Sequence, residues 1–217
     1  MQVNNVRVYN LPEAIVTSGF PMLVDYEPNQ VESIMACVKA YIEESDKREQ
    51  YMSVAKPHID RMIRLASAPS NSGHPNAMTG ILVSFTVTAS NTWLLQAERY
   101  HFLQIVSCQS KMHRLTKILK ESRTAVELLD EDDLDWMQKC VEAYEAGEID
   151  EENLIYSCPM GLQLTCGMVT NYLQLKNIYH QRKNHKLAEW KRFCGWIETL
   201  PMARELIVGK VNEEEAK

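Results

Sequence analysis

In a short segment near the middle of the chain, apolar residues at every second position alternate, from Val83 onward, with hydroxyl side chains. Its apolar positions are Ile81, Val83, Phe85 and Val87, and between and after them stand Ser84, Thr86 and Thr88. Successive side chains of a β-strand point to opposite faces, so this period of two predicts a strand with one buried face. A lone strand is not stable in water, so the segment predicts a fold that contains a β-sheet.

Most of the remaining sequence has helical spacing. Val3–Tyr9 is predicted as a further strand at a sheet edge, because Val6 and Val8 alternate before the turn at Asn10-Leu-Pro12. The predicted helices are 29–45 with an Asn-x-x-Glu capping box, one from Pro57, 92–106 capped by Ser90 or Asn91, 112–121, 132–145, and most of the chain from Pro159 to Ile197. Residues 147–157 are predicted as irregular. The pattern favours an α+β fold in a single domain, 1–217, with a frayed tail at about 212–217.

Composition narrows the classes of function. The formal net charge of −6 lacks the Lys and Arg surplus of a protein that coats nucleic acid, although a single nucleotide remains an admissible ligand. No stretch approaches the roughly 20 apolar residues that span a bilayer, and the N-terminus shows no signal peptide. The six cysteines show no CxxC pair and no zinc-site spacing. We therefore expect reduced, mostly buried thiols, no metal site and a cytoplasmic location.

The block from Gly73 to Arg114 is unusually polar for a packed segment. His74 follows a glycine in a loop rich in small residues, and Gln96, Arg99 and Tyr100 share one face of the predicted 92–106 helix. Hydrogen-bonding side chains then crowd the segment Ser107-Cys-Gln-Ser-Lys-Met-His-Arg114. Such a cluster suits a phosphate and the edge of a base. A solvated helix face followed by a polar turn is the alternative, and the residues alone leave it open.

Together these pieces resemble the flavin-dependent thymidylate synthases, the ThyX family. The family signature reads Gly-His, a strand ending near a Phe, a Gln three residues before Arg-His-Arg, and a loop closing in Ser-x-Arg-Tyr. Here His74, Phe85, Gln96 and Arg99 stand at the same spacings without a gap. The later segments Asn171-Tyr-Leu-Gln-Leu-Lys176 and His185-Lys-Leu-Ala-Glu-Trp190 are similar to the family's Asn-Phe-Leu-x-Leu-Arg and His-Ala-Gln-Trp-Glu.

The resemblance implies a ThyX-like fold, with a small, mostly antiparallel sheet packed against several helices, and a homotetramer. It implies FAD, NADPH and methylenetetrahydrofolate as cofactors, and conversion of dUMP to dTMP without an enzyme nucleophile. By resemblance the residues at the flavin are His74, Arg99, Tyr100, His101 and Asn171. Those at the nucleotide are Gln96, Ser107, Gln109, Ser110, Lys111, Lys176 and Arg182, and the groups that orient the reactants are Arg99, Lys176 and Arg182.

The chain departs from the family pattern at three places. Arg-His-Arg is Arg99-Tyr100-His101, the phosphate-binding Arg of the loop is Lys111, and the Arg that ends Asn-x-Leu-x-Leu-Arg is Lys176, with Arg182 as a rival. Lys cannot reproduce the bidentate fork of Arg. Two alternatives therefore stay open: a related flavin enzyme that makes hydroxymethyl-dUMP or hydroxymethyl-dCMP, and a non-catalytic nucleotide-binding homolog.

Overall fold

The structure, a computed structural model, describes residues 1–209, with the backbone only at position 71. The predicted frayed tail at 212–217 lies outside the described residues. In chain order the elements are β1 (Gln2–Tyr9), α1 (Leu11–Thr17), η1 (Phe20–Met22), α2 (Pro28–Glu43), η2 (Ser45–Lys47), α3 (Arg48–Ala66), η3 (Ser70–Ser72), η4 (His74–Gly80), β2 (Leu82–Ser90), α4 (Asn91–Ala97), β3 (Gln104–Cys108), α5 (Lys111–Glu121), α6 (Arg123–Val126), α7 (Glu131–Glu145), α8 (Glu151–Tyr156), β4 (Gln163–Asn171), α9 (Tyr172–Arg182), α10 (Ala188–Ile197) and η5 (Arg204–Val208).

The strands form one four-stranded antiparallel sheet in the order β1-β2-β4-β3. Two backbone hydrogen bonds bracket the central pair: Asn91 N–H donates to the Leu162 carbonyl over 3.0 Å, and Tyr172 N–H donates to the Ile81 carbonyl over 3.1 Å. Residue numbers rise along β2 as they fall along β4, so the two strands are antiparallel. The α+β class is confirmed, and so is the position of β1 at a sheet edge.

In β2, buried and half-buried side chains alternate in the same way as the apolar and hydroxyl residues that predicted the strand. Ile81, Val83 and Val87 are fully buried and Phe85 is 2% exposed, whereas Ser84, Thr86 and Thr88 are half-buried on the other face. The strand is longer than predicted and ends at Ser90, whose side chain accepts a hydrogen bond from Trp93 N–H and so caps α4.

The prediction of a helix after Pro159 is wrong over its first half, because Gln163–Asn171 forms β4. Leu162, Cys166 and Val169 stand at helical spacing, but the residues that the strand buries are Leu164, Cys166, Met168 and Thr170, at every second position. Pairing with β2 on one side and β3 on the other overrides the local pattern. The helical prediction holds from Tyr172 onward, through α9 and α10.

Three further boundaries differ from prediction. The capping box at Asn29 does not form, because α2 begins one residue earlier with Pro28 in its first turn and has no side-chain cap. Pro57 lies inside α3, where burial of Ala55, Ile59, Met62 and Ala66 offsets the backbone hydrogen bond that Pro cannot donate. Within the stretch predicted as irregular, Asp150 accepts a hydrogen bond from Asn153 N–H and starts the short helix α8.

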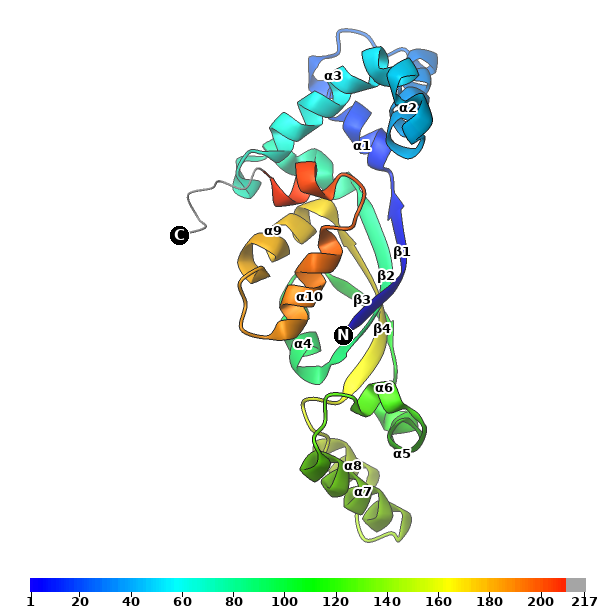
Figure 1. Cartoon of the computed structure of the whole chain (residues 1–217), viewed down its shortest axis with the longest axis vertical. Helices are drawn as coiled ribbons and strands as arrows, with labels where there is room; N and C mark the ends of the chain where they lie inside the picture. The colour runs from blue at the N-terminus through cyan, green and yellow to red at the C-terminus, as the bar shows by residue number, and fades with distance from the viewer. Residues whose placement is uncertain (210–217) are drawn as a thin grey trace. The chain divides into compact units, whose positions relative to one another are not determined.

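The chain divides into two compact units, each made of two chain segments. The first unit, Met1–Asn5 with Phe85–Met168, contains α4 to α8; its α5 packs against α6, α7 and α8 (Figure 1). Its largest fully buried side chains are Phe85, Trp93, Leu154, Leu162 and Met168.

The second unit, Val6–Ser84 with Val169–Lys217, contains α1 to α3, η4, α9, α10 and η5. Within it α2 and α3 lie side by side, and α9 packs against α10, η4 and η5 (Figure 1). Its core is built on Ile15, Met62, Tyr172, Trp190 and Phe193. None of the helices within residues 1–209 combines the length and the apolar character needed to cross a membrane.

Candidate functional site

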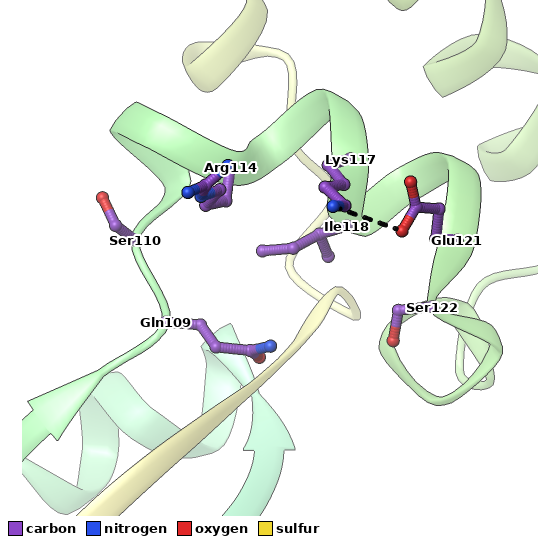
Figure 2. Close-up of a pocket in the computed structure, with 7 residues that line it drawn as sticks. All are labelled: Gln109, Ser110, Arg114, Lys117, Ile118, Glu121 and Ser122. Atoms are coloured by element: carbon purple, nitrogen blue, oxygen red, sulfur yellow. Dashed lines mark ion pairs between the residues drawn. The ribbon is translucent and has the colours of Figure 1, made fainter.

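A cleft of about 480 Å³ opens beside α5 in the first unit (Figure 2). We call it the α5 cleft, and its lining residues are Gln109, Ser110, Arg114, Lys117, Ile118, Glu121 and Ser122. Its volume falls in the range of pockets that hold small molecules, about 300–1,000 Å³. Both ends of α5 contribute to the lining, so the cleft extends along the helix.

The two residues that follow β3, Gln109 and Ser110, line one part of the cleft and are held by hydrogen bonds. Gln109 bonds to Thr165 twice: its N–H donates to the Thr165 carbonyl over 3.0 Å, and its Oε1 accepts from Thr165 N–H over 2.8 Å. Ser110 follows as the cap of α5, where its hydroxyl accepts from His113 N–H over 3.3 Å. With Oε1 engaged, the amide group of Gln109 still has its two N–H donors.

The remaining lining residues follow from helical periodicity. Arg114, Lys117, Ile118 and Glu121 recur every three or four residues and therefore share the face of α5 that borders the cleft. Ile118 is buried and supplies an apolar patch. Lys117 pairs with Glu121 at 3.8 Å, an exposed ion pair drawn in Figure 2.

Positive charge is concentrated near the start of α5. Within the described residues, no ion pair engages Arg114, whose side chain lies along the helix between Ser110 and Lys117 in Figure 2. The backbone N–H groups at the start of a helix carry a partial positive charge that favours anions. Arg114, the Ser110 hydroxyl and this helix terminus together form a site suited to a phosphate-sized anion.

The residues of the predicted polar loop, 107–114, do not all lie at the cleft. Gln109 and Ser110 line the cleft, and Ser107 is exposed on β3. Lys111 is the first residue of α5 and lies near Cys158: burial raises the pKa of the Cys158 thiol, and the charge of Lys111 opposes that rise. Arg114 belongs to the polar block but was not among the predicted site residues. Arg114 is four residues after the Ser110 cap, a spacing that places both on one side of a helix, and this spacing could have identified it.

Arg99, Tyr100 and His101 lie in a turn, not on a helix. Helix α4 ends at Ala97 and β3 begins at Gln104, so the predicted helix 92–106 is wrong beyond its first half, and Gln96 does not share a helix face with Arg99. The β-branched Ile105 and Val106 enter β3, where pairing with β4 is available. Arg99 and His101 are both exposed, and the His101 ring packs edge-on against Phe102.

In the second unit, His74 is presented by a glycine turn. Gly73 has φ 76°, a left-handed conformation that favours glycine, and η4 begins at the next residue. His74 is exposed there, at the end of the loop that follows α3. The loop predicted from the sequence therefore exists, and it holds an imidazole at its surface.

Asn171 is the cap of α9. Its Oδ1 accepts a hydrogen bond from Gln174 N–H over 2.8 Å, and the residue is 9% exposed. The next residue, Tyr172, is fully buried and donates its hydroxyl to the Pro201 carbonyl over 2.7 Å; burial raises its pKa. Asn171 thus has a structural role in starting α9.

The two predicted cations of this region, Lys176 and Arg182, both contact protein groups. Lys176 Nζ donates to the Ala66 carbonyl over 2.5 Å and to the Ala68 carbonyl over 2.9 Å, at the end of α3, and burial lowers its pKa. The Arg182 guanidinium lies over the Trp190 ring, with its carbon 4.8 Å from the ring centroid, in a cation–π contact. Among residues 1–209, His, Cys, Asp and Glu form no group arranged to hold a metal ion.

The cysteines depart from the sequence prediction. Cys108 and Cys166 are joined as a disulfide, so the expectation of six reduced thiols is wrong for this pair. Cys37, Cys140, Cys158 and Cys194 are free, as predicted, and Cys140 and Cys194 are buried. Burial raises the pKa of the Cys194 thiol to about 12, so this group is an unreactive thiol at neutral pH.

No protein-family profile and no curated protein matches the sequence. Solved structures do match. A flavin-dependent thymidylate synthase ThyX from Helicobacter pylori, crystallised with FAD and dUMP, aligns with a TM-score of 0.63 and 15% identity over 95% of this chain and 97% of that one. A second structure of thymidylate synthase X from Helicobacter pylori, also with FAD and dUMP, aligns with a TM-score of 0.62 and 12% identity over the same shares. The chain therefore has the ThyX-like α+β fold.

Proposed function

We propose that this protein binds a flavin and a pyrimidine deoxynucleotide and transfers a one-carbon unit to C5 of the pyrimidine, converting dUMP to dTMP. The observation that carries the proposal is the α5 cleft, an anion-suited site built at the Ser110 cap in a chain with a ThyX-like fold. The two structural neighbours were crystallised with FAD and dUMP.

The nucleotide would occupy the α5 cleft with its phosphate at the start of the helix. There the Ser110 hydroxyl and the first N–H groups of α5 would donate to the phosphate oxygens, and Arg114 would neutralise their charge. The donors of the Gln109 amide and the apolar surface of Ile118 lie in the same cleft. A polar group and an apolar surface in one pocket are what a pyrimidine ring with exocyclic oxygens requires.

The chain also carries donors that fit a flavin dinucleotide. Arg99 and His101 are exposed in the turn after α4, and within residues 1–209 no ion pair occupies either side chain. Both can donate to a diphosphate, and His74 stays a predicted flavin residue. The bound flavin would supply the reducing electrons, with methylenetetrahydrofolate as carbon donor and NADPH as reductant. Gln96, Tyr100, Ser107, Lys111 and Asn171 stay predicted site residues, and we expect a cytoplasmic homotetramer.

One observation favours a second candidate, a flavin enzyme with a different C5 product such as hydroxymethyl-dUMP or hydroxymethyl-dCMP. Lys176, which stands where the resemblance predicts a nucleotide-binding Arg, uses donors on the carbonyls of Ala66 and Ala68. A pyrimidine contact made by Arg in the family would then be remade by another group, with Arg182 as the predicted alternative. A changed contact at the base changes which base is accepted.

The nucleotide site is tested by binding dUMP to an Arg114→Met variant, measured by calorimetry. Charge-assisted hydrogen bonds contribute about 1.5–3 kcal/mol, so we expect the Kd to rise roughly 10- to 100-fold. The matched control is Lys139→Met, which removes a positive charge from an exposed position of α7 that does not line the cleft. Equal Kd values for the two variants would refute the assignment.

The reaction is tested by product mass. The protein is incubated with FAD, NADPH, methylenetetrahydrofolate and either dUMP or dCMP. A methylated product from dUMP supports thymidylate synthesis, and a hydroxymethylated product supports the second candidate. Nucleotide binding without any product under these conditions would identify a non-catalytic homolog and refute both enzyme proposals.

A further inference from the structure

A disulfide joins the two strands between which the chain forms α5 to α8. Cys108 ends β3 and Cys166 lies near the start of β4, and 58 positions separate them in the sequence. Between them the chain leaves the sheet at Gln109, forms α5 to α8, re-enters the sheet at Gln163 and pairs with Gln109 at Thr165. The bond therefore joins β3 and β4 next to the segment that contains α5 to α8, and Cys108 directly precedes Gln109, which lines the α5 cleft.

The position of the two cysteines allows the bond to open and close without large backbone movement. Gln109 N–H donates to the Thr165 carbonyl, and the side-chain Oε1 of Gln109 accepts from Thr165 N–H, so these two residues lie opposite each other on antiparallel segments. The next pair along such a ladder is non-hydrogen-bonded, and there the side chains of opposed residues are closest. Cys108 and Cys166 form that pair, with their Cα atoms 4.0 Å apart.

Cys108 is the more exposed of the two cysteines. Strand β3 is at the edge of the sheet, Cys108 is partly exposed, and Val106, two residues earlier on the same strand face, is 70% exposed. Cys166 is fully buried. A thiolate that approaches the open edge can therefore attack the Cys108 sulfur, with the Cys166 sulfur as leaving group.

We propose that Cys108 and Cys166 form a reversible redox switch that controls the order of the α5 cleft. In the reducing direction a dithiol gives two electrons and two protons, the S–S bond breaks, two cysteine thiols form, and the dithiol becomes a disulfide. In the oxidising direction a small disulfide such as oxidised glutathione accepts them. A reducing cytosol holds the pair as thiols and oxidising conditions close the bond.

The disulfide can affect the cleft because Cys108 is only one or two residues away from the lining residues Gln109 and Ser110. Ser110 is two residues after Cys108, and the backbone of the intervening Gln109 is held to Thr165. With the disulfide closed, residues 108–109 are fixed both covalently and by hydrogen bonds. With it open, hydrogen bonds alone hold Gln109 to β4 at the end of β3, and such strand ends fray.

The first experiment counts thiols and follows amide exchange on the full chain. Alkylation in denaturant without reductant should label the four free cysteines after treatment with oxidised glutathione, and all six after treatment with dithiothreitol. Reduction should speed amide exchange in residues 109–122 by about fivefold or more while leaving α10 unchanged. Six labelled cysteines under both conditions, or a closed bond without any change in exchange, would overturn the proposal.

A second arm uses variants and dUMP as the probe. Cys108→Ser should show fast exchange in 109–122 under both conditions, and Cys37→Ser, which removes a free cysteine of α2, should respond as the unaltered protein does. A Cys108→Ser variant that exchanges like the oxidised protein would also overturn the proposal. The dUMP measurement rests on the proposed function: reduction should weaken binding about tenfold, because a pre-ordered site costs less to fill. If exchange responds to reduction but dUMP does not bind, the switch stands and the nucleotide assignment fails.

Discussion

Replacing Lys176 with Met separates a structural role of this residue from a role at a ligand. Lys176 Nζ donates to the carbonyls of Ala66 and Ala68, at 2.5 Å and 2.9 Å, and so ties α9 to the end of α3. Met keeps most of the aliphatic stem but donates no hydrogen bond, and the two carbonyls lose their partner. The loop that leads to His74 begins at this point.

The loss of stability expected for Lys176→Met depends on the two hydrogen bonds that Lys176 makes and on how exposed they are to water. A hydrogen bond from a charged donor contributes about 1.5–3 kcal/mol. Because Lys176 is only half-buried, water replaces part of what is lost, and we take about 2 kcal/mol for the pair. For a chain of 150–250 residues this corresponds to a fall in Tm of about 4–8 °C.

The assay is calorimetric or circular-dichroism melting of the ligand-free protein, with reversibility checked. Lys176→Arg retains donors and should recover at least half of the loss. Lys186→Met, which removes an exposed lysine of the same unit, should change Tm by less than about 1–2 °C. If Lys176→Met melts like the unaltered protein and loses only nucleotide binding, the structural role of the bonds to Ala66 and Ala68 is refuted and Lys176 acts on the ligand alone.

Two further changes test local features. Ser110→Ala removes the cap that accepts from His113 N–H and should cost about 1 kcal/mol, seen as a lower denaturant midpoint, with recovery in Ser110→Asn; an unchanged midpoint would contradict the cap. His58 accepts a hydrogen bond from Arg61 on Nδ1, and burial, then the charge of Arg61, lowers its pKa from 6.5. The unfolded chain therefore takes up the proton first, so the free energy of unfolding should fall as pH drops below 6.5, and His58→Gln should flatten that slope; an unchanged slope in the variant would refute the assignment.

The sequence predicted correctly those elements that depend on short-range patterns, such as a cap residue or the spacing of apolar side chains. The alternation through Phe85 became β2, the Ser90 cap started α4, and the apolar spacing around Trp190 became α10. Gln109 and Ser110 were also among the predicted site residues, and they line the α5 cleft. The crowding of hydrogen-bonding side chains between Ser107 and Arg114 was the signal for them.

Long-range pairing accounts for what the sequence could not show. Leu162, Cys166 and Val169 have helical spacing, and pairing with the neighbouring β2 and β3 selects a strand over Gln163–Asn171 instead. The same pairing ends α4 early and brings Cys108 opposite Cys166 across 58 positions. No spacing rule along the chain identifies partners that are set by sheet register.

We propose that this chain is a flavin protein with a nucleotide site, and retention of FAD by the purified protein tests this claim. The purified protein is incubated with FAD, separated from free flavin by gel filtration, and its visible absorption spectrum is recorded before and after addition of dUMP. We predict that the flavin absorption elutes with the protein and shifts when dUMP is added. Protein that elutes without flavin absorption, at FAD concentrations well above those of the protein, would contradict the claim.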